Sequence, residues 1–107
     1  MITIAIRLDP ARMANPDADL RYLIPDRIQE ATDNRVSDDG YDYLDDDTMI
    51  IFMNATSPDN LTAVLEILQK ETFCENKILD TAVIGLDSGE GYVVVYPEGF
   101  SGDFCDG

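Results

Sequence analysis

The sequence predicts an α+β domain in which two helices pack on one face of a mostly antiparallel sheet. Two stretches carry apolar residues at helical spacing, and five stretches show strand-like patterns. They follow one another as strand, helix, strand, strand, helix, strand, strand. A chain of 107 residues fits one domain. We expect that domain to span residues 1–97, followed by an acidic, glycine-containing tail at residues 98–107.

The first strand is expected at residues 2–8, where bulky apolar residues alternate with smaller or polar ones. The first helix is expected to start at Asn15 as N-cap and Pro16 as first helical residue, and to run to about Thr32. Its apolar stripe comprises Leu20, Leu23, Ile24, Ile28 and Ala31. Pro25 either kinks this helix or divides it. The solvated face is expected to carry two arginines near local acids, Arg21 and Arg27.

An acidic hairpin is expected over residues 36–53. Its first strand and tip should face outward, with the turn formed by Asp45, Asp46 and Asp47. On the first strand Tyr41 and Tyr43 are expected to share one face, and Asp42 and Leu44 are expected to share the other. The second strand, residues 48–53, is apolar on both faces, which suits a central position in the sheet. Its methionines are expected to fill the core: Met49 and Met53.

The second helix is expected to start at Ser57 as N-cap and Pro58 as first helical residue, and to end near Glu71. Its stripe comprises Leu61, Val64, Leu65 and Leu68. Two more strands, residues 81–86 and 92–96, flank a glycine-containing loop typical of a hairpin. The first six elements match the split β-α-β, or ferredoxin-like, arrangement, and the seventh adds a strand at one edge.

The chain has 22 acidic and 7 basic residues, a formal charge of −15. Six of the acids fall within ten residues of the hairpin: Asp38, Asp39, Asp42, Asp45, Asp46 and Asp47. Such a field repels nucleic acids and anionic membranes and steers a cationic molecule toward the surface. We therefore expect a basic protein as partner, and neither nucleic-acid nor membrane binding.

The sequence also argues against most catalytic chemistry. It contains no histidine, which excludes Ser-His and Cys-His catalysis within the chain. Counting back from Gly40 places Arg35 at the first ligand position of an EF-hand, so only weak adventitious cation binding remains for the aspartates. The loop after Gly85 lacks the Lys-Ser/Thr of a phosphate-binding loop. We expect no enzymatic activity, no cofactor and no metal site.

The cysteine count and the apolar runs predict a cytoplasmic protein. Two cysteines, Cys74 and Cys105, are too few for a disulfide-stapled secreted domain. They are expected to stay reduced, with a disulfide between them as the alternative. No apolar run is long enough for a signal peptide or a membrane-spanning helix.

In general character the aspartate cluster with its two tyrosines resembles the small acidic immunity proteins that neutralise nucleases or other basic toxins in bacterial competition systems. It resembles DNA-mimicking inhibitors more loosely, and both likenesses are to a class. They imply tight binding to a cationic toxin domain and occlusion of its active surface. The residues concerned are Asp38, Asp39, Tyr41, Asp42, Tyr43, Asp45, Asp46 and Asp47. In such a surface carboxylates steer the partner and tyrosines anchor it.

Three alternatives stay open at this point. The acidic cluster could serve only solubility and the protection of an edge strand. The chain could form a homodimer through its last strand, residues 92–96, although the charge of each copy opposes this. It could also bind a small ligand between sheet and helices.

Overall fold

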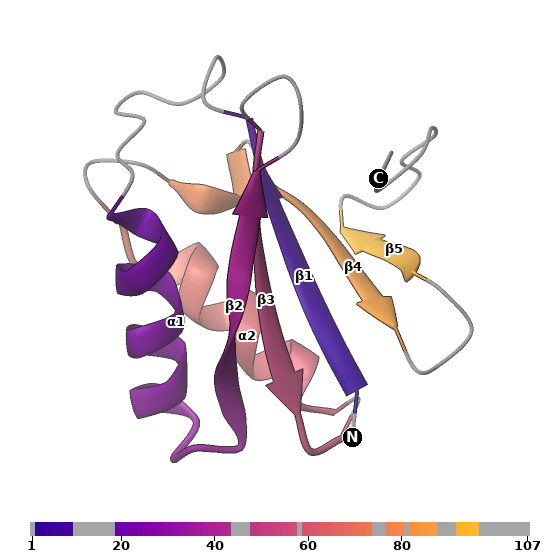
Figure 1. Cartoon of the computed structure of the whole chain (residues 1–107). Coiled ribbons are helices and arrows are strands. Elements are labelled where there is room, and N and C mark those ends of the chain that lie inside the picture. Colours follow the sequence, from indigo (N-terminus) through magenta and orange to yellow (C-terminus); the bar gives the residue numbers. More distant parts are fainter. Residues whose placement is uncertain are drawn as a thin grey trace.

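The computed structural model describes residues 2–9, 19–43, 48–57, 59–73, 77–80, 82–87 and 92–96. In these ranges two α-helices lie on one face of a five-stranded antiparallel sheet, which confirms the predicted α+β class (Figure 1). The strands are β1 (Ile2–Leu8), β2 (Val36–Tyr43), β3 (Met49–Ala55), β4 (Val83–Asp87) and β5 (Tyr92–Tyr96). The helices are α1 (Leu20–Ala31), α2 (Asn60–Lys70) and a short 3-10 helix, η2 (Ile78–Asp80).

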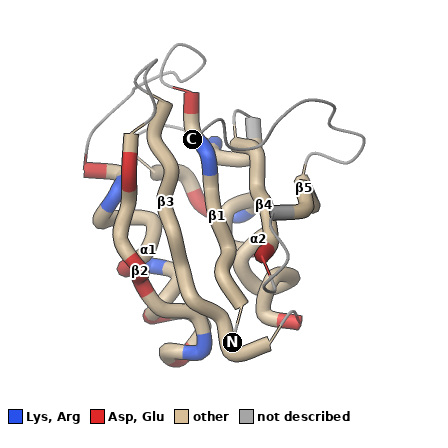
Figure 2. Tube along the Cα trace, turned by 45° about the vertical axis from the view of Figure 1, so that its right-hand side comes forward, with Lys and Arg blue, Asp and Glu red and all other residues tan. Residues whose placement is uncertain are grey.

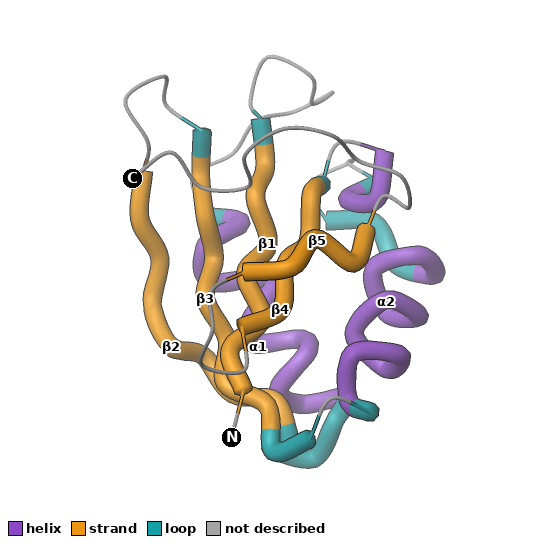
Figure 3. The backbone as a smooth tube through the Cα atoms, turned by 90° about the vertical axis from the view of Figure 1, so that its right-hand side faces the viewer, coloured by secondary structure: helices purple, strands orange, loops and turns teal. Residues whose placement is uncertain are grey.

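The strands lie side by side in the order β2-β3-β1-β4-β5, and every neighbouring pair is antiparallel. β3 therefore separates β1 from β2, the two strands that flank α1 in the chain. This order is compatible with the ferredoxin-like arrangement, which stays a prediction. β5 lies at one edge, as expected, and the acidic β2 lies at the other. Figure 3 shows the sheet and the helices as two layers.

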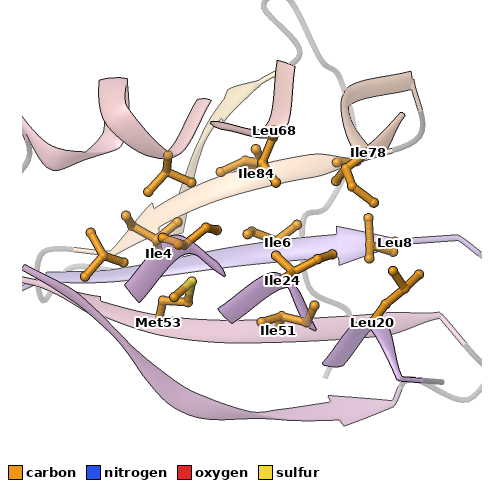
Figure 4. Packing of buried hydrophobic residues seen from close by; sticks show 14 of the residues in the cluster. Ile4, Ile6, Leu8, Leu20, Ile24, Ile51, Met53, Leu68, Ile78 and Ile84 are labelled. Atoms are coloured by element: carbon orange, nitrogen blue, oxygen red, sulfur yellow. The ribbon is translucent and has the colours of Figure 1, made fainter. Parts of the chain in front are cut away.

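The main core lies between the sheet and the helices. Alternate residues of β1 point into it, and each pairs with a core residue of β3. In order, the β1 residues are Ile2, Ile4, Ile6 and Leu8, and their β3 partners are Ala55, Met53, Ile51 and Met49. The helices cover these residues with Leu20, Ile24, Ile28, Val64 and Leu68 (Figure 4). Burying each large aliphatic side chain contributes about 1.5–3 kcal/mol. The predicted core role of the two β3 methionines is confirmed, since both are buried.

The other face of the sheet carries a smaller apolar cluster. It comprises Ala5, Ile50 and Val83, with Phe52 and Val94 packed against them. β3 thus contributes buried residues to both faces and pairs with strands on both sides. This confirms the central position predicted for it.

α1 differs from its prediction in its start and in its apolar face. It begins at Leu20 with Asp19 at the N-cap position, whereas the expected start at Asn15 lies outside the described residues. The helix is continuous through Pro25 and is not divided. Leu23 is 44% exposed, because α1 packs mainly on the edge strand β2 and only a narrow stripe of it is covered. The buried stripe is limited to Leu20, Ile24, Pro25 and Ile28, and Ala31 is exposed.

α2 begins at Asn60, two positions after the expected first helical residue. Before the helix, the Asp59 N–H donates to Ser57 Oγ (3.2 Å) and the Asn60 N–H donates to the Ser57 carbonyl (3.1 Å). The predicted start at Ser57 was therefore wrong, and Pro58 lies outside the described residues. The predicted end is confirmed, with Glu71 at the C-cap position.

Arg27 ties the end of α2 to α1. Its Nε donates to both carboxylate oxygens of Glu71, at 2.8 and 3.0 Å, and its Nη1 lies 3.6 Å from Glu30 Oε1. This arginine thus has the local acid expected for it and also a distant one. The hydrogen bond and charge of Glu71 raise the pKa of Arg27.

Several predictions fall outside the described residues: the aspartate turn at 45–47, both cysteines and the tail at 98–107. Where the chain is described, no helix combines the length and the apolar character that crossing a membrane requires.

Candidate functional site

The candidate site is the outward side of β2. Apart from Val36 and the half-buried Ser37, the residues of this strand are exposed. The strand carries five of the predicted partner-binding residues: Asp38, Asp39, Tyr41, Asp42 and Tyr43. The other three, Asp45, Asp46 and Asp47, lie outside the described residues. Figure 2 shows the acidic positions along β2 at the edge of the sheet. The expectation that the first strand of the hairpin faces outward is confirmed.

A β-bulge decides which way the β2 side chains point. Asp38 and Tyr41 are three residues apart, yet their partners on β3 are only two apart. Because side chains alternate along a strand, the extra residue reverses the faces of all that follow. Tyr41 and Tyr43 pair with core residues of β3 and so lie on the helix side, while Asp42 lies on the other side. The predicted separation of the tyrosines from Asp42 is confirmed.

Gly40 and Asp38 shape this bulge. Gly40 has φ of +96°, a conformation that costs glycine little and other residues much more. Its N–H donates to Asp38 Oδ1 at 2.8 Å. One of the predicted binding carboxylates therefore has a structural role as well.

Side chains satisfy several backbone donors along β2. The Val36 N–H donates to Thr32 Oγ1 (3.2 Å), the Asp38 N–H to Gln29 Oε1 (3.3 Å) and the Tyr43 N–H to Asp42 Oδ1 (2.8 Å). An edge strand with unpaired donors invites another strand to pair with it, whereas these donors are occupied. The arrangement favours recognition by the β2 side chains over strand addition.

Three tyrosines form an exposed group, which we call the tyrosine cluster: Tyr22 of α1 with Tyr41 and Tyr43 of β2. The ring centroids of Tyr22 and Tyr41 are 6.2 Å apart at 83°, and those of Tyr41 and Tyr43 are 5.8 Å apart at 81°. Both pairs are edge-to-face, a geometry worth about 0.5–1.5 kcal/mol per pair. The three side chains are 42–48% exposed, so their rings pack on one another and are still accessible.

Arg21 lies within the tyrosine cluster. Its Cζ is 4.6 Å from the centroid of Tyr22 and 5.1 Å from that of Tyr41, and its Nη1 donates to Tyr43 Oη at 3.5 Å. Hydrogen bonds to Tyr22 and Tyr43 raise the pKa of Arg21, and the hydrogen bond and charge of Arg21 lower the pKa of Tyr22. Arg21 was expected on a solvated face near acids; instead it is half-buried against aromatic rings.

The chain was compared with protein-family models, curated proteins and solved structures. None of them matches it. The chemistry of the site therefore comes from its own residues. Exposed carboxylates and aromatic faces both attract cations. In the described ranges, no group of three Cys, Asp or Glu side chains could hold a metal ion.

Sequence reasoning identified the acidic strand and its two tyrosines but missed Arg21 and Tyr22. No local signal marks these two residues, because they reach β2 only through the packing of α1 on it. Their contacts join positions about twenty residues apart in the chain.

Proposed function

We propose that this chain is an acidic protein-binding domain that neutralises a basic partner, such as a toxin domain, by covering its active surface. One observation carries the proposal. β2 exposes Asp39 and Asp42 as well as Tyr41 and Tyr43, on a strand that has several of its backbone donors already bonded to side chains.

The charge and the rings contribute different parts of binding. A formal charge of −15 speeds the encounter with a cationic surface and makes it dependent on salt. Half-exposed tyrosines supply a large contact area with few rotatable bonds, which is why they are frequent among the residues that dominate interface energies. The acids should therefore control association and the rings dissociation.

The first experiment is affinity capture from a lysate of the source cell at low and at high salt, with identification of each captured protein. We expect a basic protein that is retained at low salt and weakened at high salt. Its catalytic activity, if it has one, should be lost at one equivalent of this chain. Absence of any basic partner at both salt concentrations would contradict the proposal and leave the acidic strand a role in solubility.

Two double variants then locate the surface. Asp39→Asn with Asp42→Asn removes two charges from β2 and keeps the Oδ1 that accepts the Tyr43 N–H. Asp59→Asn with Glu66→Gln removes two charges from exposed positions beside and on α2. We expect the β2 pair to slow association more and to lessen its salt dependence more than the α2 pair. Equal effects would show that only the net charge matters and that β2 is not the contact surface.

Self-association through β5 is a second candidate. β5 is the other edge of the sheet, and its Val93 is 67% exposed, the most exposed large hydrophobic side chain among the described residues. A free edge strand can pair with its copy. Sedimentation of the wild type and of Val93→Lys would test this, because a dimer formed through β5 should dissociate in the variant.

A further inference from the structure

We propose that the tyrosine cluster selects arginine: the basic partner presents a guanidinium of an arginine-rich segment to the ring of Tyr43. The inference rests on the proposed function, because it names the chemical group by which the same surface would recognise its partner. It differs from a purely electrostatic surface, which would accept lysine equally well.

The cluster already binds a guanidinium from its own chain. Arg21 lies 4.6 and 5.1 Å from two ring centroids, inside the range of about 6 Å over which a cation is attracted to an aromatic face. These contacts, with the 3.5 Å bond to Tyr43 Oη, join α1 to β2. Arg21 is therefore a positioning residue that holds the tyrosines in place before a partner arrives.

The ring of Tyr43 is the position left for a second guanidinium. Arg21 stacks on Tyr22 and Tyr41, and its Nη1 donates to the hydroxyl of Tyr43. No described cation lies over the Tyr43 ring, and this side chain is 44% exposed. Its edge-to-face contact with Tyr41 fixes the orientation of the ring. Stacking of a cation on the ring would therefore cost little further conformational freedom of the Tyr43 side chain.

The chemistry of an aromatic ring favours a guanidinium over an ammonium group. Asp42 lies on the other side of β2, so it adds negative charge to the surface but does not share this ring's ligand. Planar guanidinium stacks on an aromatic ring and is weakly hydrated. An ammonium group is compact and strongly hydrated, so it gains less from the ring. The arrangement therefore favours arginine beyond its charge.

Two synthetic peptides test the inference directly: octa-arginine and octa-lysine, which carry the same charge. Binding of each to the full chain is measured by isothermal titration calorimetry in the same buffer. We expect octa-arginine to bind about threefold to tenfold more tightly, as a single added cation–π contact would give. Tyr43→Leu should bring the two affinities together and leave that of octa-lysine nearly unchanged. Tyr43→Phe keeps the ring and should keep the preference, and circular dichroism of both variants checks that they fold.

The outcomes separate the inference from the function on which it rests. Equal affinities for the two peptides in the wild type overturn arginine selection, while a cationic partner still stands. An arginine preference that persists in Tyr43→Leu also overturns it, since the ring is then not its cause. Binding of neither peptide at low salt overturns both the selection and the proposed attraction of a basic partner.

Discussion

Replacing Gly40 by alanine should destabilise the protein through its backbone alone. The φ of Gly40 is +96°, which side-chain-bearing residues rarely adopt. An added Cβ would meet no atom within 4 Å, so no steric clash contributes to the loss. The remaining cost is that of holding alanine in this conformation, about 1–2 kcal/mol of unfolding free energy. For a domain of this size, 1 kcal/mol corresponds to a drop in Tm of about 4–8 °C.

Urea denaturation followed by circular dichroism measures this loss, and thermal denaturation checks it. Asp39→Ala is the matched control, because Asp39 is the exposed neighbour in the same bulge and has no positive φ. It should change the unfolding free energy by no more than about 0.5 kcal/mol. An alanine variant as stable as the wild type would refute the conformation described for Gly40. It would also undermine the bulge that brings Tyr41 and Tyr43 to the helix side.

Two further predictions concern single side chains. Thr32 Oγ1 donates to the Ile28 carbonyl (2.8 Å) and accepts the Val36 N–H (3.2 Å) at a buried site. Thr32→Val should therefore lower the unfolding free energy measured by urea denaturation by about 1–3 kcal/mol, whereas Thr32→Ser, which keeps the hydroxyl, should lower it less. Similar losses in both variants would show that the hydroxyl does not matter. Tyr22 should ionise at lower pH than an ordinary tyrosine in an ultraviolet absorbance titration, and Arg21→Met should return it to the ordinary value. Because the lowered pKa belongs to the folded state, that state binds fewer protons than the unfolded chain between the two pKa values, and the contribution of Tyr22 to stability rises with pH in this window. Ordinary titration of Tyr22 in the wild type would contradict the contact with Arg21.

The elements that were predicted well are those whose pattern is local. β1 and β5 have the predicted bounds because alternating or continuous apolar residues over five to seven positions are a local signal of a strand. Element ends depended on contacts that the sequence does not show. Leu23 belongs to the apolar stripe of α1 by spacing, but the edge strand beneath the helix is too narrow to cover it.

The site was predictable in its composition and not in its geometry. The density of aspartates in the hairpin indicated an exposed acidic strand, which the structure has. The bulge at Gly40 could not be foreseen, because it is defined by the register of β2 on β3 and not by β2 alone. The same holds for Arg21 and Tyr22. Their helix was recognisable, but the strand on which it packs was not.

The way β2 is held has a consequence for how this surface can change over generations. Its place in the sheet depends on Val36, on the bulge at Gly40 and on bonds from Thr32 and Gln29 to its backbone. Exposed positions such as Asp39 take no part in these contacts. Substitutions there alter what the strand presents while leaving the fold intact. The exposed residues of β2 can thus be varied one at a time while the chain remains folded at every step.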